Sequence, residues 1–536
     1  MESISKKLKI INWIIILFSI FSNLFAQEET CVDCHKESKS SCNISCQDCH
    51  SSPNADFIPN EKDHPTIIQN PSLEKWWDEK CVSCHEDYIK KFRSSQHYST
   101  ADIINQTRYL WGKDESLKNN NHDSWKELEK EGVASGNTPV ELVDNLLAKK
   151  CMACHFNASG KQNAVGKKRN SGCASCHIPL DQITGKALFG HKMQKEVRDE
   201  TCLTCHTSNY VGADYFGYFE HDYHEEYATP FGAEPIFGSY QHRLIKDVHA
   251  SAEMNCSGCH TEGNSKFEKT KNCSDCHGGF NQSLKLENEN PETPLFNKEV
   301  ISHRDFHKNI ECSACHAQWS YQDYGLHLFL DETNNFQMWE NVKWQGDQGI
   351  TDLLNSASGE SHESVIPQSI NRLSGEKSRG MWYKGWTFRR WEDPVLGINE
   401  KGKYSIIRPM YQFYITYVDS NENIWLDSAI PVKSNGQKGW SWDAYSPHTI
   451  GKGRNCESCH ENPKAIGLGI RQSLKDSPAN EISLPSQPIE KSSRLLTTQE
   501  QMRLLNKSNL YKKWRAKHFI ESGLDKILKQ SPEKSK

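Results

Sequence analysis

The sequence is poor in hydrophobic residues and in methionine for its length. Across 536 residues, Ala, Val, Ile, Leu, Met, Phe, Trp, Tyr and Cys together make up only 36%, and methionine occurs 8 times. A chain this long exceeds what one compact core organises, and a thin apolar core usually needs disulfides, metals or a bound cofactor for stability. We therefore expect several structural units that are not held together by apolar packing alone.

A strong charge of either sign is also missing. The 64 Lys and Arg residues oppose 69 Asp and Glu residues, which gives a formal net charge of −5. No basic stripe stands out along the chain. Nucleic-acid-binding proteins depend on such a stripe to neutralise phosphates, so we predict no nucleic-acid partner.

Long apolar runs are missing after the first 26 residues. The one such run, from Ile10 to Phe25, follows three lysines within positions 6–9 and precedes Ala26. A basic start, a short apolar segment and a small residue are typical of a cleaved signal peptide, and the run is short for a bilayer span. We predict a signal peptide over residues 1–26 and a mature chain that is periplasmic or otherwise exported and does not span a membrane.

Cysteine and histidine are abundant, with 21 and 24 copies. Twenty of the cysteines fall into ten copies of Cys-x-x-Cys-His, which we number one to ten in chain order. The cysteine pairs are Cys31 and Cys34, Cys46 and Cys49, Cys81 and Cys84, Cys151 and Cys154, Cys173 and Cys176, Cys202 and Cys205, Cys256 and Cys259, Cys273 and Cys276, Cys312 and Cys315, and Cys456 and Cys459. The histidines that follow them are His35, His50, His85, His155, His177, His206, His260, His277, His316 and His460.

The spacing within each motif has a chemical meaning. Two cysteines three positions apart lie about one helical turn apart, so their sulfurs can reach the two vinyl groups of one haem. The adjacent histidine then becomes the proximal ligand of the iron. Zinc clusters and disulfide scaffolds also use paired cysteines, but neither requires the following histidine. We predict ten covalently bound haem c groups. The remaining Cys42 is either an incidental thiol or a competitor of Cys46 through a rarer, longer spacing.

The histidines outside the motifs are the candidates for the sixth iron ligand. There are 14 of them, and methionine is scarce, which favours histidine on both sides of most irons and hence low-potential haems suited to electron transfer. The strongest candidates lie near a motif, where they can serve a neighbouring haem; they are His97, His191, His249, His307 and His448. A second group comprises His64, His221, His224, His242, His303 and His327. His122, His362 and His518 lie in polar stretches, where we expect solvated side chains.

The spacing of the motifs suggests how the chain is organised. We predict a haem-rich region with eight motifs over 27–290, a ninth haem region over 291–350, a Trp-rich unit over 351–450 and the tenth motif within 451–470. Residues 471–536 are predicted to be a linker and an amphipathic helix. The expected fold is mostly α and irregular, packed around haems, with little regular secondary structure. One longer helix is expected over 140–150, because Thr138 can cap it and Pro139 suits its first turn.

The Trp-rich unit is the one place where strands are expected. Tyr411 to Val418 alternates apolar and polar positions, Asp419 to Asn423 is typical of a turn, and Ile424 to Leu426 resumes the pattern. We predict a small antiparallel β unit near residues 376–445. It is either a docking surface or a subdomain that packs its tryptophans beside the last haem, and the second interpretation is favoured.

One short segment resembles a known family. Cys81-Val-Ser-Cys-His85, followed by Phe92, Ser94, Ser95, His97 and Ala101, resembles the CxxCH…W/F-x-x-S-x-H segment of the hydroxylamine-oxidoreductase and tetrahaem-cytochrome lineage. The ten motifs as a whole place the chain among sequences similar to multihaem, here decahaem, c-type cytochromes. The resemblance implies that His97 is a haem ligand.

Two functions fit these observations. The first is an electron carrier in a respiratory pathway, such as anaerobic respiration, with donor and acceptor cytochromes or a membrane quinol-oxidising complex as partners. The second is a multihaem oxidoreductase that acts on nitrite, hydroxylamine, sulfite, tetrathionate or a similar oxyanion at one open haem. No motif carries lysine in place of histidine. Arg389, Arg390 and Arg408 could bind an anion or pair with haem propionates. The sequence favours the carrier and the propionate role, and it assigns no catalytic residue.

Overall fold

The computed structural model describes most of the chain after the second motif. The described residues are 45–51, 67–113, 123–131, 138–158, 168–207, 212–221, 240–261, 269–279, 295, 297, 303, 307–345, 347–359, 365–385, 388–410, 413–439, 441–468, 493–505, 516–517 and 520–521. The predicted signal peptide, the first motif, Cys42, His64, His122, His224, His362, His518 and most of the predicted C-terminal helix lie outside them.

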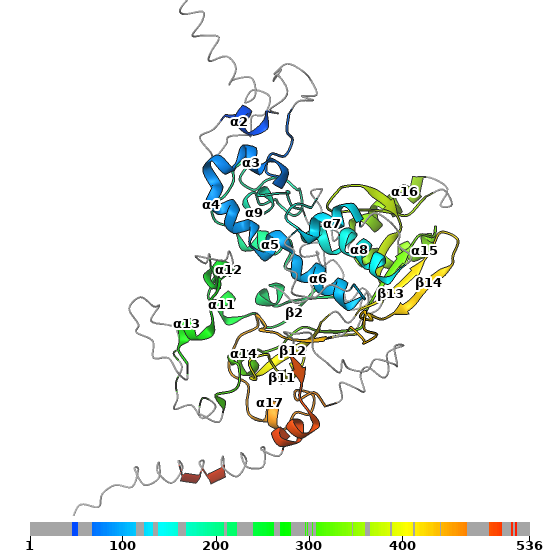
Figure 1. The fold of residues 1–536 in the computed structure, drawn as a ribbon. Helices are drawn as coiled ribbons and strands as arrows, with labels where there is room; N and C mark the ends of the chain where they lie inside the picture. The colour runs from blue at the N-terminus through cyan, green and yellow to red at the C-terminus, as the bar shows by residue number, and fades with distance from the viewer. Residues whose placement is uncertain are drawn as a thin grey trace, which may run out of the picture.

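The helices that carry the motifs are short, as predicted, and several are a single turn long. In Figure 1 they are distributed along the length of the molecule, from α2 at one end to α17 at the other. The motif helices are α2 (Cys46–His50), α4 (Val82–Arg93), η2 (Cys151–Cys154), α9 (Ala174–His177), α10 (Asp199–Cys202), α12 (Cys256–Cys259), α13 (Cys273–His277), α14 (Cys312–His316) and α17 (Glu457–His460).

Further helices lie between the motifs and around them. They are η1 (Glu74–Trp76), α3 (Trp77–Lys80), α5 (Gln96–Ser99), α6 (Ala101–Leu110), α7 (Ser124–Glu131), α8 (Pro139–Lys149), η3 (Ala213–Phe216), α11 (Val248–Ser251), α15 (Phe336–Val342), η7 (Lys343–Gln345) and α16 (Gln348–Gly359). Residues 498–505 are also helical. Within the described ranges, no helix combines the length and the apolar character that crossing a membrane requires.

The helix predicted before the fourth motif is confirmed. The hydroxyl of Thr138 accepts a hydrogen bond from the backbone N–H of Glu141 at 3.3 Å, and the Glu141 carboxylate accepts one from the Thr138 N–H at 3.0 Å. This reciprocal capping box and Pro139 in the first turn start α8. The helix ends at Lys149, two residues before Cys151, so its direction determines where the fourth motif begins.

The β structure is larger than the sequence predicted, and it is not purely antiparallel. Strands between Gln322 and Ala444, together with β16 at Arg494–Leu495, form two four-stranded sheets with orders β14-β13-β6-β9 and β15-β12-β11-β16, and two further two-stranded sheets. The expected hairpin of β13 and β14 is present, but β13 also pairs in parallel with β6, from Phe413 opposite Leu326 to Val418 opposite Asp331. Parallel pairing joins segments far apart in the sequence, which local alternation does not indicate.

The strands have the following bounds. They are β1 (Tyr218–Glu220), β2 (Gln241–Arg243), β3 (His260–Thr261), β4 (Lys269–Thr270), β5 (Gln322–Tyr324), β6 (Leu326–Asp331), β7 (Gln368–Ile370), β8 (Lys377–Arg379), β9 (Met381–Lys384), β10 (Phe388–Arg390), β11 (Leu396–Ile398), β12 (Tyr404–Met410), β13 (Phe413–Val418), β14 (Ile424–Ala429), β15 (Ser441–Ala444) and β16 (Arg494–Leu495).

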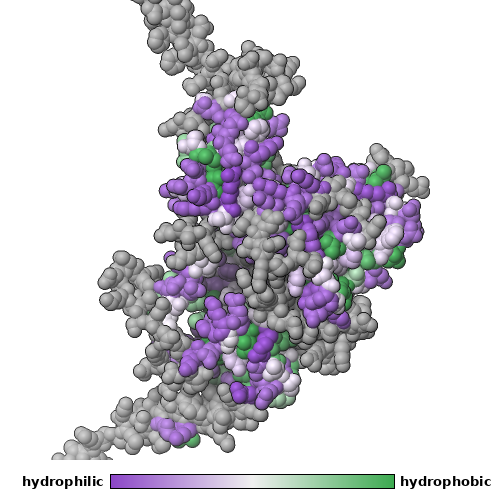
Figure 2. All heavy atoms as spheres, in the orientation of Figure 1, coloured by the Kyte–Doolittle hydropathy of each residue, from purple (hydrophilic) through white to green (hydrophobic). Residues whose placement is uncertain are grey.

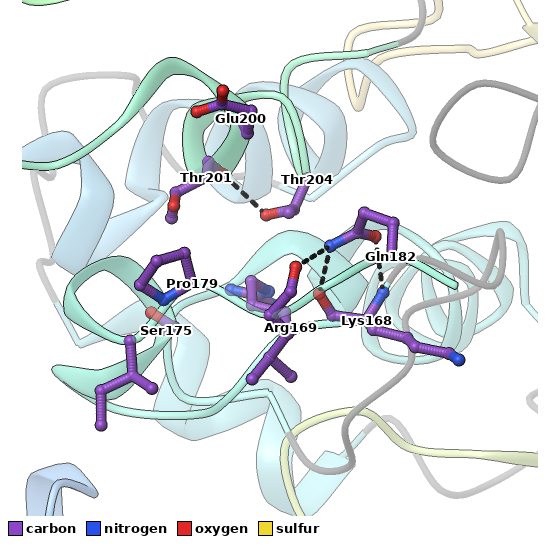
Figure 3. Close-up of a pocket in the computed structure, with 10 residues that line it drawn as sticks. Lys168, Arg169, Ser175, Pro179, Gln182, Glu200, Thr201 and Thr204 are labelled. Atoms are coloured by element: carbon purple, nitrogen blue, oxygen red, sulfur yellow. Dashed lines mark hydrogen bonds between the residues drawn. The ribbon is translucent and has the colours of Figure 1, made fainter. Parts of the chain in front are cut away.

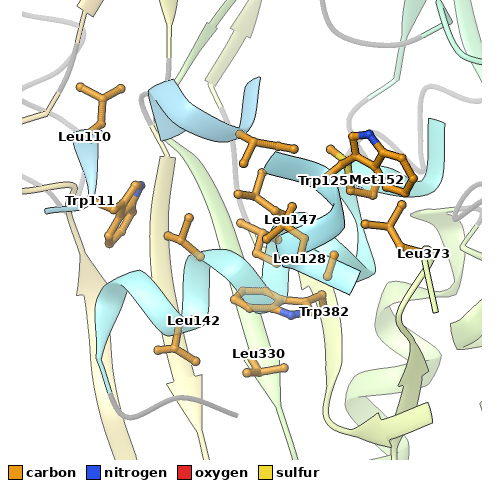
Figure 4. Close-up of a cluster of buried hydrophobic side chains, with 14 of the residues drawn as sticks. Leu110, Trp111, Trp125, Leu128, Leu142, Leu147, Met152, Leu330, Leu373 and Trp382 are labelled. Carbon is orange, nitrogen blue, oxygen red and sulfur yellow. The ribbon is translucent and has the colours of Figure 1, made fainter. Parts of the chain in front are cut away.

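The largest apolar cluster lies between the helices α6 to α8 and the sheet that contains β6, β9 and β13. Figure 4 shows Leu142 and Leu147 of α8 beside Trp382 and Leu330 of the sheet. Trp382 is fully buried, and its indole N–H donates to the amide oxygen of Asn145 at 2.7 Å. This tryptophan therefore packs beside the helix that leads into the fourth motif, rather than beside the tenth motif as expected.

A buried ion pair joins the three helices of that cluster. The Arg108 guanidinium on α6 donates to both carboxylate oxygens of Asp144 on α8, at 2.6 and 3.1 Å, and to Glu127 on α7 at 2.8 Å. Arg108 has no exposed surface. Bidentate pairing of this kind fixes the angle between helices as well as their distance. On the outside, Figure 2 shows mostly hydrophilic residues among the described ones, with scattered apolar residues.

Replacing Trp382 by alanine is predicted to destabilise the protein by about 3–5 kcal/mol, because it leaves a cavity in the core and removes the hydrogen bond from the indole to Asn145. Trp425 is the matched control, since 54% of it is exposed in β14. Its replacement by alanine should cost roughly 1 kcal/mol or less. Urea unfolding followed by circular dichroism measures both, and equal midpoints for the two variants would contradict this role of Trp382.

Candidate functional site

The described motifs fold as the spacing predicted, with both cysteines on one helical turn. In the third motif, the N–H groups of Cys84 and His85 donate to the carbonyl of Cys81 at 3.2 and 2.9 Å. The fifth, sixth and tenth motifs have the same bonds, with N···O distances between 2.8 and 3.3 Å. No two of the described cysteines form a disulfide. Each pair therefore presents two sulfurs one turn apart, the arrangement that two thioether bonds to one porphyrin require.

Several of these thiols have perturbed pKa values. Burial raises the pKa of Cys151 to about 11, that of Cys173 to about 12 and that of Cys315 to about 11. These three cysteines therefore lie in surroundings that disfavour the charged thiolate.

Six motif histidines each have a second histidine ring about 6 Å away. The distances between ring centroids run from 5.8 Å to 6.3 Å. Two imidazoles that each bind one metal through a nitrogen about 2 Å away have ring centres roughly 6 Å apart. The pairs are His50 with His191, His206 with His97, His260 with His448, His277 with His249, His316 with His303, and His460 with His307. These residues fit a haem iron held between each pair.

All five of the strongest candidates from the sequence belong to these pairs, together with His303 from the second group. Each of the five is close in sequence to one motif but pairs with the histidine of another, whereas His303 pairs with His316 of the motif that follows it. His448, for example, lies eight residues before Cys456 of the tenth motif and pairs with His260 of the seventh. The pairs therefore tie distant parts of the chain together.

Hydrogen bonds hold the paired motif histidines in one orientation. The Nδ1 atoms of His50, His316 and His460 donate to backbone carbonyls at 2.8, 3.0 and 2.9 Å. Bonding through Nδ1 places the N–H there and leaves Nε2 as the nitrogen with a lone pair for a metal. His177 has the same bond, to the carbonyl of Gln194 at 2.7 Å. The fifth motif is thus oriented for ligation as well.

Two of the spare histidines face buried carboxylates instead. Asp247 accepts from the Nδ1 of His249 at 2.9 Å, and the Asp214 carboxylate lies 3.5 Å from the Nδ1 of His448. Both aspartates are almost completely buried. Burial acts to raise the pKa of Asp214, but hydrogen bonds from His448 and from the Tyr445 hydroxyl outweigh it, and the pKa lies below its usual value. Asp214 is therefore a buried anion.

The fourth motif departs from this pattern. The Nε2 of His155, not its Nδ1, lies 3.0 Å from a backbone carbonyl, that of Tyr98, and the N–H of Asn157 donates to Nδ1 at 3.3 Å. The ring lies between Trp125 and Phe156, with centroids 4.8 and 4.5 Å away. Burial lowers the pKa of His155 to about 4. In this structure both ring nitrogens of His155 are engaged by the backbone.

Charged side chains surround the fourth motif. Lys150, directly before Cys151, forms an ion pair with Asp347, which also caps α16 through the N–H of Gly349 at 2.8 Å. Burial lowers the pKa of Lys150 despite this carboxylate, and it lowers the pKa of Lys149 to about 8. Burial also lowers the pKa of Arg372, against the influence of Asp347. Lys149, Lys150, Arg372 and the Asp347 carboxylate thus lie around this motif.

A small pocket lies between the fifth and sixth motifs, lined by residues of α9, of α10 and of the loop between them (Figure 3). Gln182 closes one side by accepting from the Lys168 N–H at 3.0 Å and donating to the Lys168 carbonyl at 2.9 Å. Arg169, in the same wall, donates to the carbonyls of Ala153 and His155 at 2.8 and 3.0 Å. This arginine connects the fourth motif to the pocket wall.

Cysteines of successive motifs approach one another along the molecule. The Cys202 thiol lies beside that of Cys256 and the Cys273 thiol beside that of Cys312, and the Cys205 thiol donates to the carbonyl of Cys154 at 3.4 Å. Electrostatic interactions also join Cys81 with Cys173, Cys176 with Cys205, Cys259 with Cys276, and Cys315 with Cys459. The motifs thus follow one another as three, five, six, seven, eight, nine and ten, with the fourth beside the sixth.

One segment, residues 448–454, lies against the seventh, ninth and tenth motifs, and we call it the strap. It begins with His448, which pairs with the seventh motif, and its Ile450 carbonyl accepts from the Val248 N–H beside His249 at 2.9 Å. Gly451 exchanges two hydrogen bonds with His316 of the ninth motif, and the Arg454 guanidinium donates to the Cys459 sulfur of the tenth at 3.5 Å. The strap therefore links three motifs directly, and it reaches the eighth only through the segment that carries His249.

The remaining candidate histidines occupy other surroundings. His221, directly after β1, and His242, on the paired strand β2, have ring centroids only 3.9 Å apart, which is too close to flank an iron. His327 in β6 is hydrogen-bonded to the Thr416 hydroxyl at 2.8 Å. The sequence placed these three in the same group as His303, and local pattern could not separate them.

The three arginines proposed for an anion or for propionates lie on two strands, β10 and β12. Arg408 on β12 stacks on Tyr445 at 4.6 Å, and Arg390 on β10 lies 3.7 Å from Asp393. Arg389 is also on β10, where its backbone pairs with Asp323. The sequence analysis missed Asp214 and Asp247. The Asp-x-His spacing before His249 could have indicated the second, whereas nothing local indicates the first.

Comparison with known proteins supports the cofactor. Residues 248–325, a segment much shorter than half the chain, match the family model of cytochrome c3. The segment contains the seventh, eighth and ninth motifs. No curated protein and no solved structure matches the chain. The match supports a multihaem c-type cytochrome that binds haem c covalently and transfers electrons.

Replacing Gly172 tests whether the close backbone contact beside the fifth motif is needed for haem attachment. Its φ is +68°, and an added Cβ would collide with the carbonyl of Ser72, which accepts from the Cys173 N–H at 3.1 Å. Gly436 has a φ of +79° and nothing within 4 Å. Alanine should cost roughly 1 kcal/mol at both positions for the left-handed backbone. At Gly172 the collision adds to this cost and should reduce haem attachment at the fifth motif.

Intact-mass spectrometry of the two alanine variants measures this directly. We expect a species that lacks one haem in Gly172→Ala and full attachment in Gly436→Ala. Full attachment and equal stability in both would show that the Ser72 contact is not needed.

Proposed function

We propose that this protein is an exported decahaem c-type cytochrome that passes electrons along a chain of mostly bis-histidine haems in a respiratory pathway. The six histidine pairs at 5.8–6.3 Å carry the proposal, because that spacing is the one an iron with two imidazole ligands needs. The ordered Nδ1 hydrogen bonds support it further. They make Nε2 the coordinating nitrogen without any rearrangement of the ring.

The proposed ligand set follows from these pairs. Each of the ten motifs attaches one haem c through its two cysteines and supplies its histidine as proximal ligand. Histidine on both sides fills the coordination sphere and gives low-spin, low-potential haems suited to one-electron transfer. The proposed distal ligands are His191 for the second motif, His97 for the sixth, His448 for the seventh, His249 for the eighth, His303 for the ninth and His307 for the tenth.

The row of cysteine contacts supports transfer along the length of the protein. Interactions between cysteine side chains connect the third motif to the fifth, and each following motif to the next as far as the tenth. Electrons would enter at one end and leave at the other. Donor and acceptor cytochromes, or a membrane quinol-oxidising complex, are the proposed partners, and the compartment is the periplasm or another exported location.

A specific observation keeps the enzyme alternative open at the fourth motif. His155 is turned into the core, and its ring neighbours among the described residues are Trp125 and Phe156 rather than a spare histidine. Lys150, Asp347 and Arg372 lie around the motif. If one iron has an open position for a nitrogen or sulfur oxyanion, the fourth is the proposed place, and Lys150 and Arg372 would bind the anion.

Two histidine variants test the ligand assignment in the exported holoprotein. His307→Ala removes a proposed distal ligand of the tenth motif and should convert one haem from low spin to high spin in the electron paramagnetic resonance spectrum. His327→Ala is the matched control, since this histidine is bonded to Thr416 and paired with no motif histidine in the described structure. We expect its spectrum to match that of the unaltered protein.

Electron paramagnetic resonance, together with a pyridine haemochrome count, also distinguishes the two functions. A carrier should show a pyridine haemochrome count of ten and no response of its oxidised spectrum to nitrite, hydroxylamine or sulfite. A high-spin signal that shifts on adding one of these, and that is lost in Lys150→Ala, would favour the oxidoreductase. An unchanged low-spin spectrum in His307→Ala would refute the ligand assignment.

A further inference from the structure

The candidate distal histidines of the seventh and eighth motifs differ from four other described histidines in the group that faces Nδ1, behind the ring. His50, His303, His316 and His460 each bond a neutral backbone carbonyl through Nδ1. His249 and His448 instead face the carboxylates of Asp247 and Asp214. These two histidines pair with successive motifs, whose cysteines Cys259 and Cys276 interact electrostatically.

The protein holds both carboxylates firmly in place. Asp247 accepts from the His249 backbone N–H at 2.8 Å with the oxygen that faces the ring, and its other oxygen accepts from the Ile450 N–H at 2.6 Å. Asp214 accepts from the His448 N–H at 2.9 Å, from the Gly212 N–H at 3.1 Å and from the Tyr445 hydroxyl. Asp247 is 1% exposed and Asp214 is 0% exposed. Neither side chain can turn away from its histidine without breaking several bonds.

Both carboxylates also bind the strap. Asp214 bonds its first residue, His448, and Asp247 bonds Ile450, two residues further on. The strap therefore brings the distal ligand of the seventh motif and the carboxylate of the eighth into one hydrogen-bonded unit. Two separate anions thus act on neighbouring haem sites through one rigid segment.

We infer that Asp214 and Asp247 are positioning residues that lower the reduction potentials of the seventh and eighth haems below those of the haems with carbonyl-bonded histidines. This inference rests on the proposed function, because it takes His448 and His249 as iron ligands. A buried anion behind an imidazole makes its coordinating nitrogen a stronger donor. It also stabilises the oxidised, more positive iron relative to the reduced one, and low local polarity strengthens the effect.

The consequence for the row of haems is a low-potential pair near its middle. The seventh and eighth motifs lie between the sixth and the ninth in the order of cysteine contacts. At equilibrium, electrons would then collect on the haems to either side of this pair. Such a profile separates two groups of haems that can each hold electrons, while transfer through the pair still connects them.

The test is a spectroelectrochemical titration of the exported holoprotein, unaltered and with Asp214→Asn, Asp247→Asn or both. Asparagine keeps a hydrogen-bond acceptor and removes the charge. Each single variant should move the amplitude of one haem from the low-potential end of the titration to higher potential, and the double variant should move the amplitude of two. Asp247→Glu should retain the unaltered curve if the charge is what matters.

Asp419→Asn is the matched control, because Asp419 also accepts several hydrogen bonds, from Asn421, Asn423 and Trp425, but does so in the turn between β13 and β14. It should leave the titration unchanged. Unshifted curves in both Asp214→Asn and Asp247→Asn, with haem count and low-spin signals intact, would overturn the inference while leaving the proposed function standing.

Failure of the proposed function has a different signature. If His249→Ala and His448→Ala leave every haem low-spin, these histidines are not ligands, and both the ligand assignment and the tuning role fail together. If an Asp→Asn variant loses a haem, the other single variant still tests the prediction, because the two carboxylates act on different histidines.

Discussion

The bond from a histidine Nδ1 to a fixed acceptor is the interaction on which the arrangement of the candidate sites depends. An imidazole can bind a metal through either nitrogen, and a backbone carbonyl or a carboxylate behind Nδ1 selects Nε2. At His316 that acceptor is the carbonyl of Gly451, 135 residues away in the sequence. The ring orientation at one motif is therefore a property of the whole fold. His155 bonds a carbonyl through Nε2 instead, so its ring has a different orientation from those of the other motif histidines with carbonyl partners.

A conventional core supports one side of this arrangement. The low apolar content of the sequence suggested that bound groups would have to supply most of the stability, but α6, α7 and α8 pack on a four-stranded sheet around Trp382 and Leu330. The capped helix α8 ends two residues before Cys151, so its direction determines where the fourth motif begins. The part of the molecule near the strap has a smaller apolar cluster, around Ile406 and Tyr445, and depends more on hydrogen bonds.

Sequence alone predicted the features that depend on local spacing. The motifs, their helical turns, the capped helix before Cys151 and the hairpin after Val418 all follow from residues within a few positions of each other. The five best distal candidates came from proximity to a motif. Which motif each one faces could not be predicted, because His448 reaches the seventh motif through contacts between distant segments. The parallel β6–β13 pairing and the carboxylate of Asp214 were missed for the same reason.

Charge near these sites has consequences that differ with its position. Behind a ligand, as at Asp247, a fixed anion changes the electron density on the coordinating nitrogen. Beside a motif, as at Lys150 and Asp347, the charges do not act through an iron ligand. They instead determine which ions can approach the motif. The first arrangement suits haems that hand electrons to one another, and the second suits a haem that meets a small anion. The seventh and eighth motifs therefore differ in kind from the fourth, although all three have the same five-residue pattern.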